Sequence, residues 1–212
     1  MLKDFSKFYL DYLETNLSGL NLTRITKYDE FYEKQVLDSI IPFQKDSEVS
    51  YIANSQKLVV DLGFGGGFPI LALREILGNE IRLVGIESRK KKVNAVSAIS
   101  NSYGQKNIYF VHSRIEDVII DEKCLITLKA VGDIKKMLSK INCIEGSYVL
   151  FYKGKNLDTL EPKYEVCPGF KFVKRTKFQI GDNERSVVLY EKLKITKNHK
   201  TLVKLSDLVF NK

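Results

Sequence analysis

The sequence has little of several residue types from which metal sites and disulfide scaffolds are built. It contains no tryptophan, two histidines and three cysteines among 212 residues. Cys124, Cys143 and Cys167 are odd in number and lack the spacing of metal ligands, so they predict neither a zinc site nor a disulfide framework. We therefore expect no metal, and three reduced thiols in the core of a cytoplasmic protein.

Long apolar runs are also missing. No stretch approaches the ~20 residues that a membrane span requires, and charges interrupt the amino end, Met1–Phe5, unlike a signal peptide. The hydrophobic content of 44% is nevertheless sufficient to fill a core. A chain of 212 residues has the size of one α/β domain with a small appendage. The sequence thus favours a single domain without membrane contact, with a monomer as the default state.

Acidic residues are scarce in two stretches of the chain, whose formal net charge is +8. Residues 82–106 carry six basic groups and one acidic group, and residues 171–212 carry eleven and four. The first stretch includes the consecutive cations Arg89–Lys92. This distribution favours a polyanionic partner, most simply a nucleic acid. The alternative is an ordinary lysine-rich, solvated surface.

A glycine-rich turn is the most informative feature that is present. Residues 59–70 read V-V-D-L-G-F-G-G-G-F-P-I, so that an apolar strand leads through Asp61 into Gly63, Gly65 and Gly67 before a helix. Glycines here let a ligand lie against the main chain, and the helix start directs free N–H groups toward it. The alternation differs from the G-x-G-x-x-G of dinucleotide sites. It suits a nucleotide ligand without phosphates, of which S-adenosylmethionine (SAM) is the commonest.

Periodic patterns place helices first and then alternate strands with helices. Early helices are predicted over Leu2–Leu17, over Tyr28–Ile41 with an end before Pro42, and over residues 46–55. Strands are predicted at Leu58–Leu62, Arg82–Glu87, Ile108–His112, Leu125–Ala130 and Tyr148–Tyr152. The helices between them are predicted at Pro69–Leu77, Ser88–Tyr103, Asp133–Ile141 and Leu157–Lys163. This alternation predicts right-handed βαβ units and a parallel sheet.

The end of the chain follows another pattern. Phe170–Ile180 and Arg185–Leu193 flank the turn Gly181–Glu184 and predict an antiparallel hairpin that closes the sheet. The predicted fold is α/β and Rossmann-like, with a mostly parallel seven-stranded sheet and an antiparallel terminal hairpin, which is the layout of a class I SAM-dependent methyltransferase.

We divide this single domain into three parts. A helical N-terminal extension covers residues 1–56, a SAM-binding core covers residues 57–193, and a basic C-terminal tail covers residues 194–212. Apolar residues from Leu202 to Phe210 predict that part of the tail packs back as a short helix, with disorder as the alternative.

Polar residues that follow the strands predict a pocket, since ligands of open α/β sheets bind at the carboxyl ends of the strands. Glu87 ends the second strand, where its carboxylate is placed to accept hydrogen bonds from both ribose hydroxyls. Ser113–Glu116 follow the third strand, where we expect an adenine with Ile115 on its face. Lys129 ends the fourth strand, facing the place where methyl donor and acceptor meet.

Several segments together carry a resemblance to a known family. They are, in chain order, Asn21–Ile25 (N-L-T-x-I), Val36–Ile40 (H-x-x-D-S-L), Val60–Pro69 (D-[IV]-G-[ST]-G-x-G-x-P), Ser113–Glu116 (S-R-[AV]-E), Leu128–Ala130 (S-R-A), Tyr152–Gly154 (K-G) and Glu184–Val188 (E-R-x-L-V). Over about residues 15–192 the chain thereby resembles the RsmG (GidB) family of small-subunit ribosomal RNA guanine-N7 methyltransferases.

The resemblance implies methylation of N7 of a guanine in the 530 loop of 16S rRNA, guanine 527 in the family, on free rRNA or on the small ribosomal subunit. It implies SAM contacts at Gly63, Phe68, Ile115, Glu116 and Lys129. With the pocket and glycine-turn residues added, the predicted cofactor-binding set is Asp61, Gly63, Phe64, Gly65, Gly67, Phe68, Glu87, Ile115, Glu116 and Lys129. Lys129 is also the candidate for positioning the reactants.

The chemistry fits a chain with two histidines. Guanine N7 carries a lone pair and no proton, so the transfer needs alignment of the reactants rather than a general base. Phe64 and Phe68 are candidate platforms on which a base stacks, or plain pocket wall. The candidates for contacting RNA phosphates are Arg24, Lys27, Lys153, Lys155, Arg175 and Arg185.

Three residues depart from the family pattern. Gln35 stands where the family usually has His, Lys129 where it has Arg, and Ile70 where it often has a second Gly. Lys129 keeps the charge but loses the planar fork that makes bidentate contacts. The alternatives left open are a SAM-dependent methyltransferase of another RNA or of a small molecule, a catalytically inactive SAM- or RNA-binding protein, and an NAD-dependent oxidoreductase.

Overall fold

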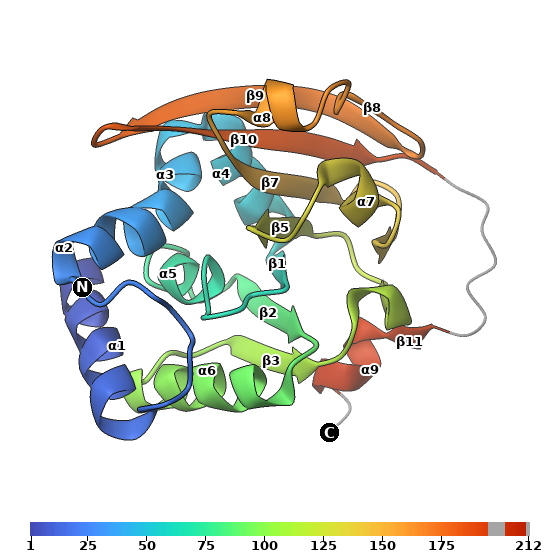
Figure 1. Cartoon of the computed structure of the whole chain (residues 1–212). Coiled ribbons are helices and arrows are strands. Elements are labelled where there is room, and N and C mark those ends of the chain that lie inside the picture. The colour runs from blue at the N-terminus through green and yellow to red at the C-terminus, as the bar shows by residue number, and fades with distance from the viewer. Residues whose placement is uncertain (195–201, 211–212) are drawn as a thin grey trace.

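The computed structural model describes residues 1–194 and 202–210 and consists of a twisted sheet with helices on both sides (Figure 1). The helices of the first hundred residues pack on one face, and the later, shorter ones pack on the other. Successive side chains of a strand point to opposite faces, so β1 (Leu58–Leu62) supplies Val59 to the first core and Val60 to the second. The continuous apolar run of this strand reflects burial on both faces.

The N-terminal extension is helical, as predicted, and its first helix is deeply packed. α1 (Leu2–Asn16) buries the side chains of Phe5 and Tyr9 completely. α4 (Ser47–Gln56) begins after Asp46, whose carboxylate accepts hydrogen bonds from two amides of the first turn. The extension shares one hydrophobic core with the sheet.

The prediction that a helix ends before Pro42 is wrong. α2 (Tyr28–Phe31), a π-helical turn (Tyr32–Leu37) and α3 (Asp38–Lys45) form one continuous helical stretch that includes this proline. Proline removes one N–H donor from a helix, and the π-turn upstream already departs from the regular hydrogen-bond pattern. Burial of apolar side chains such as Ile40 outweighs this local loss.

The main sheet has the strand order β3-β2-β1-β5-β7-β10-β9-β8. Its other strands are β2 (Arg82–Glu87), β3 (Ile108–His112), β5 (Leu125–Lys129), β7 (Tyr148–Gly154), β8 (Val166–Cys167), β9 (Phe170–Ile180) and β10 (Asn183–Lys192). The first five strands in this order run parallel, and β10 is antiparallel to both of its neighbours. The seven predicted strands are therefore present, and the two-residue β8 adds an eighth at the edge.

The connecting helices have the predicted order but different lengths. They are α5 (Ile70–Arg74), α6 (Lys90–Tyr103), α7 (Ile134–Leu138) and α8 (Leu157–Leu160). The terminal hairpin turn is tighter than predicted, because Asn183 and Glu184 already pair in β10. Two-residue turns match the twist of hairpin strands. No helix in the described part of the chain is long and apolar enough to cross a membrane.

A second, small sheet was not predicted. It has the order β11-β4-β6, formed by β11 (Val203–Lys204), β4 (Val118–Ile120) and β6 (Asn142–Cys143). Strands of two or three residues leave no period in a sequence. α9 (Leu205–Phe210) follows β11, which confirms the predicted short helix in the tail. The other tail residues, 195–201 and 211–212, lie outside the described residues.

Candidate active site

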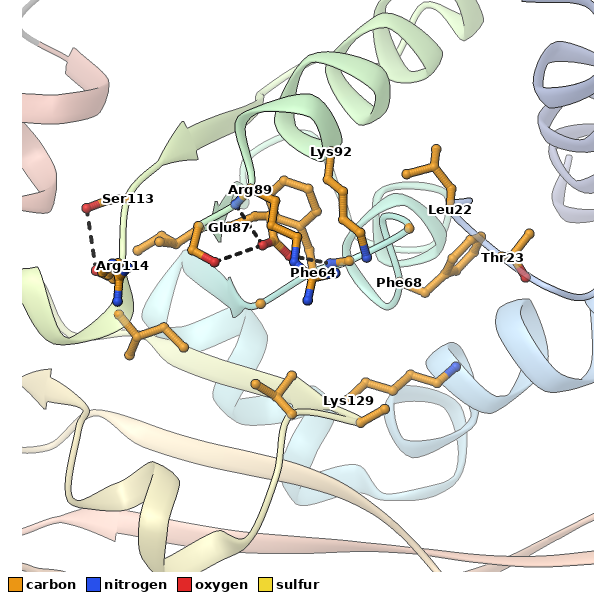
Figure 2. A pocket seen from close by; sticks show the side chains of 18 of the residues that line it. Leu22, Thr23, Phe64, Phe68, Glu87, Arg89, Lys92, Ser113, Arg114 and Lys129 are labelled. Carbon is orange, nitrogen blue, oxygen red and sulfur yellow. Dashed lines mark hydrogen bonds between the residues drawn. The ribbon is translucent and has the colours of Figure 1, made fainter. Parts of the chain in front are cut away.

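A cavity of about 590 Å³ opens at the carboxyl ends of the central strands (Figure 2). It lies where β1 has β2 on one side and β5 on the other, the switch point at which open α/β sheets bind ligands. Eight of the ten predicted cofactor-binding residues line it, namely Gly63, Phe64, Gly65, Phe68, Glu87, Ile115, Glu116 and Lys129. The other two, Asp61 and Gly67, are not part of its wall.

Asp61 lies beneath the glycine turn and is fully buried. Its carboxylate accepts hydrogen bonds from the Ile70 amide at 3.2 Å and from the Thr127 hydroxyl at 3.0 Å. Burial raises the pKa of the Asp61 carboxyl from 3.8 to about 7. Through these two hydrogen bonds, Asp61 connects the start of α5 to β5. It stabilises the glycine turn from the side that faces the protein interior.

Two glycines of the turn have different structural roles. Gly65 has φ +55°, and a Cβ there would meet nothing closer than 3.8 Å, on the cavity side of the turn. Gly67 has φ +93°, and a Cβ there would lie 2.5 Å from Cδ1 of Leu71. Gly65 therefore leaves room for a ligand, whereas Gly67 permits the close approach of α5.

The N-terminal extension supports the same turn from outside the core fold. The buried hydroxyl of Tyr9 donates a hydrogen bond of 2.7 Å to the carbonyl oxygen of Gly66. The ring of Phe68 packs against the rings of Tyr9, Phe31 and Phe5, at centroid distances of 5.2, 5.4 and 6.4 Å. The extension is therefore part of the site, and the Phe68 ring is held in an aromatic cluster.

Phe64 is likewise a wall residue. It is 2% exposed, and its ring packs edge-on against Phe110 at 5.4 Å. A Cβ on Gly85 would lie 2.6 Å from the Phe64 ring, so a glycine in β2 makes space for it. Of the two interpretations offered by the sequence, packing favours pocket wall over a free stacking platform for both phenylalanines.

Glu87 ends β2 and points its carboxylate along the cavity edge (Figure 2). Its Oε2 accepts a hydrogen bond from the Gly65 amide at 3.2 Å, and its Oε1 accepts from the Arg89 amide at 2.9 Å and the Ser88 hydroxyl at 3.2 Å. An ionised carboxylate offers about four lone-pair sites. The protein therefore fixes its orientation while capacity remains for a donor in the cavity.

The cavity wall opposite the glycine turn and Glu87 is formed by the residues that follow β3. The single turn η2 (Ile115–Asp117) brings Ile115 and Glu116 to the cavity. Lys140 pairs with the Glu116 carboxylate at 3.4 Å, and the pKa of Glu116 is lowered, chiefly by a backbone hydrogen bond. An apolar face beside a backbone edge is suited to an adenine ring.

Lys129 lines the cavity with its stem, but its ammonium turns toward the N-terminal extension (Figure 2). Nζ lies 3.0 Å from Oδ2 of Asp38 and donates to the carbonyl oxygens of Lys34 and Gln35 at 3.1 and 3.2 Å. Burial lowers the pKa of Lys129, and the charge of Asp38 opposes that shift. The ammonium thus ties β5 to the π-turn and α3.

The six candidate RNA contacts divide into two groups. Arg24, Lys27 and Lys155 are exposed. The other three form ion pairs within the protein, Lys153 with Glu161, Arg175 with Asp158 and Arg185 with Asp38. Lys153 is also only 13% exposed, so its side chain is committed to the fold.

Sequence reasoning passed over some residues of the wall. Leu22 and Thr23 line the cavity from the loop after α1, where their motif N-L-T was the available signal. Arg89 and Lys92 line it from the start of α6, and their signal was the basic run, which the sequence analysis connected with a nucleic acid partner but not with the cofactor pocket. Among the described residues, no group of three or more His, Cys, Asp or Glu side chains is arranged to hold a metal ion.

Comparison with known proteins shows the family to which this chain belongs. The model of the GidB family, described as rRNA small subunit methyltransferase G, matches residues 2–188. The chain belongs to this family. A GidB-family relative, the ribosomal RNA small subunit methyltransferase G of Streptococcus pyogenes serotype M1, is 27% identical over 208 residues, which cover 92% of this chain and 85% of the relative.

Solved structures share the fold with this GidB-family chain. TrmN from Thermus thermophilus superposes with a TM-score of 0.52 at 15% identity, over 76% of this chain and 53% of its own. A SAM-dependent methyltransferase from Aquifex aeolicus gives 0.51 at 14% identity, over 73% of this chain and 92% of its own. The predicted class I methyltransferase fold and the predicted family are both confirmed.

Proposed function

We propose that this chain uses SAM to methylate N7 of a guanine in the 530 loop of 16S rRNA. Its membership of the GidB family supports the reaction and the substrate class. The observation that carries the proposal is the cavity at the switch point, where the glycine turn and the Glu87 carboxylate form one wall and Ile115 forms the other. The guanine, its loop and the residue roles below are part of the proposal.

The residues present fit SAM in their chemistry. Glu87 keeps acceptor capacity for a ribose hydroxyl, and the open side of Gly65 lets the nucleoside approach the main chain. Ile115 supplies an apolar face for the adenine, beside the backbone after β3. Asp61 and Gly67 support this cradle from behind and contact no ligand in our assignment.

The chain's own residues then act by alignment. SAM supplies an activated methyl group on a positively charged sulfur, and guanine N7 offers a lone pair without a proton to remove. The described cavity wall includes no histidine, and the His112 ring lies outside it, with Nε2 3.0 Å from the Ser88 carbonyl oxygen. Orientation and exclusion of water are the contributions that remain.

We place the RNA on the exposed cations around the cavity. Arg24, Lys27 and Lys155 keep the role that the sequence gave them, because their side chains are exposed. We add the run Arg89–Lys92, of which Arg89 and Lys92 already border the cavity. The proposed partner is 16S rRNA or the small subunit in the cytoplasm, bound by a monomeric enzyme.

The test is transfer of labelled methyl from SAM to 16S rRNA and to small subunits, both prepared from a host that lacks this enzyme. Mass spectrometry of nuclease fragments then identifies the product and its position. The expected result is N7-methylguanine at a single guanine of the 530 loop. Label at another position or in another RNA overturns the assigned substrate, and SAM binding without transfer to either form overturns the assigned activity.

A further inference from the structure

The C-terminal segment, residues 202–210, lies beyond the family match, which ends at residue 188, yet it occupies a defined place. β11 pairs in parallel with β4, with Val203 opposite Val118 and Lys204 opposite Ile119. α9 follows and contacts both β3 and β4, beside the outer end of β3 (Figure 1). This segment adds a strand and a helix to the side of the domain that bears the cavity wall after β3.

Two kinds of contact anchor the segment. The Asp121 carboxylate accepts hydrogen bonds from the Ser206 amide at 3.2 Å and from the Ser206 hydroxyl at 2.6 Å. Leu205 is 3% exposed within the second core, and Leu208 and Val209 pack against that core. The negative charge of an acidic side chain beside the first turn of a helix also interacts favourably with the positive end of the helix dipole.

The segment meets the cavity through β4. The turn η2, which carries Ile115 and Glu116 to the cavity, runs directly into β4. Ile115 packs against the same core as Leu208 and Val209. From the other side, the side-chain amide of Asn142 in β6 donates to the Glu116 carbonyl oxygen at 3.4 Å. The wall is therefore held between β6 and the C-terminal segment.

We propose that residues 202–210 clamp the adenine side of the cofactor cavity, with Asp121, Leu205 and Ser206 as positioning residues for SAM binding. None of the three lines the cavity, so they act through Ile115 and Glu116. The inference rests on the proposed function in one respect, since that function places the adenine at Ile115. It assigns a role to a segment outside the matched family region.

Loosening the clamp has a specific signature. Because the clamp holds only the adenine side, and all three ligands below contain the adenine, its loss weakens each of them by the same factor. SAM, S-adenosylhomocysteine and methylthioadenosine, which lacks the amino-acid end, should all bind roughly 5- to 20-fold more weakly, a size typical of coupling between distant positions. General unfolding of the cavity would instead loosen the glycine turn and Glu87 as well as the wall that carries Ile115.

The experiment compares four full-length proteins by calorimetric titration with these three ligands. They are the wild type, Leu205→Asp, Asp121→Ala and the control Lys204→Ala, whose side chain is exposed in the same segment. Amide hydrogen exchange, read in peptides covering residues 113–120 and 58–70, reports where the structure loosens. Asp121→Ala keeps the test informative if Leu205→Asp fails to fold.

The expected result is equal weakening of the three ligands in both test variants, faster exchange confined to residues 113–120, and no change in Lys204→Ala. Ligand affinities within twofold of the wild type in a folded test variant overturn the clamp. Faster exchange across residues 58–70 as well also overturns it, because the effect is then general destabilisation. A wild type that binds none of the ligands overturns the proposed function itself.

Discussion

At the scale of single residues, the Lys129 ammonium at the end of β5 is held by contacts within the protein. It is surrounded by Asp38 and backbone carbonyls of the N-terminal extension. We expect Lys129→Met to lower the free energy of unfolding by roughly 3 kcal/mol, because it leaves buried Asp38 with Arg185 as its remaining ion-pair partner. Urea unfolding measures this change.

Two variants serve as controls for Lys129. Lys34→Ala removes an exposed ion pair with Glu30 and should cost less than about 1 kcal/mol. Lys129→Arg keeps the positive charge and should recover part of the loss. A Lys129→Met protein as stable as the wild type, with methyl transfer abolished, would instead assign the ammonium to the reacting groups.

Asp61 makes stability depend on pH in an unusual direction. Its folded-state pKa is about 7 against 3.8 for the free side chain, so the folded protein holds the proton between these values. This contribution to stability is complete below pH 4 and is lost as the pH rises through 7. Relative to Asp61→Asn, the wild-type free energy of unfolding should fall over this interval by roughly 4 kcal/mol at most. Urea titrations at several pH values test this, and a constant difference contradicts it.

A substitution at Gly65 is expected to have two effects, one on backbone strain and one on the space available to the ligand. Valine at φ +55° is strained, so Gly65→Val should lower the free energy of unfolding by about 1–2 kcal/mol. Its side chain also occupies the cavity, so the Kd for SAM should rise at least tenfold. Gly104→Val provides the control, since Gly104 has φ +84° and open space at the end of α6. Equal SAM affinities in the two variants would exclude Gly65 from the cofactor site.

At the scale of elements, α6 begins with charges of the sign that its dipole disfavours. Arg89 precedes the helix, Lys90, Lys91 and Lys92 form its first turn, and that turn has no acidic residue. Lys90→Glu combined with Lys91→Glu should therefore stabilise the fold by up to about 1 kcal/mol. The same change should raise the KM for rRNA several-fold, because it removes two exposed cations near the cavity.

A variant of α6 that is more stable but has a higher KM for rRNA would show that these lysines contact RNA. Lysines that are merely solvated would leave KM unchanged. The matched control is Lys135→Glu with Lys136→Glu, two adjacent exposed lysines of α7 on the other side of the sheet. That pair should leave the KM for rRNA unchanged. If both double variants change KM equally, net charge alone governs RNA binding and α6 has no special part.

At the scale of the whole molecule, a formal charge of +8 makes binding to RNA sensitive to salt. The logarithm of the affinity for an rRNA fragment should fall linearly with the logarithm of the salt concentration. In filter-binding titrations, the α6 double variant should reduce the slope by about 1–2, as expected for two lost phosphate contacts. An unchanged slope would place those lysines away from the RNA.

The predicted strand bounds were accurate for β1, β2 and β3. β1 and β2 are almost fully buried and leave short apolar runs in the sequence, whereas the edge strand β3 is mostly half-buried or exposed and was recognised by its β-branched and aromatic residues. The small sheet was missed because its strands have two or three residues. The helix through Pro42 was missed because the proline rule is local, whereas packing of the extension on the core is not.

The candidate site shows the same division. Backbone motifs led to the glycine turn, to Glu87 and to Ile115, because strand ends in a parallel sheet converge on one edge. The sequence did not reveal that Asp61 lies below the turn, nor that Arg175 is paired with Asp158. Which charges meet depends on side-chain placement in the finished fold, and spacing along the chain does not encode it.

The pairing of β4 with β11 has a consequence for the order in which the enzyme is made. Asp121 emerges from the ribosome long before Ser206, its hydrogen-bond partner 85 residues later. A growing chain thus presents the glycine turn and Glu87 well before the clamp on Ile115 can close. In our proposal, a chain that has not yet been extended through residues 202–210 already has the glycine turn and Glu87 but binds the methyl donor only weakly.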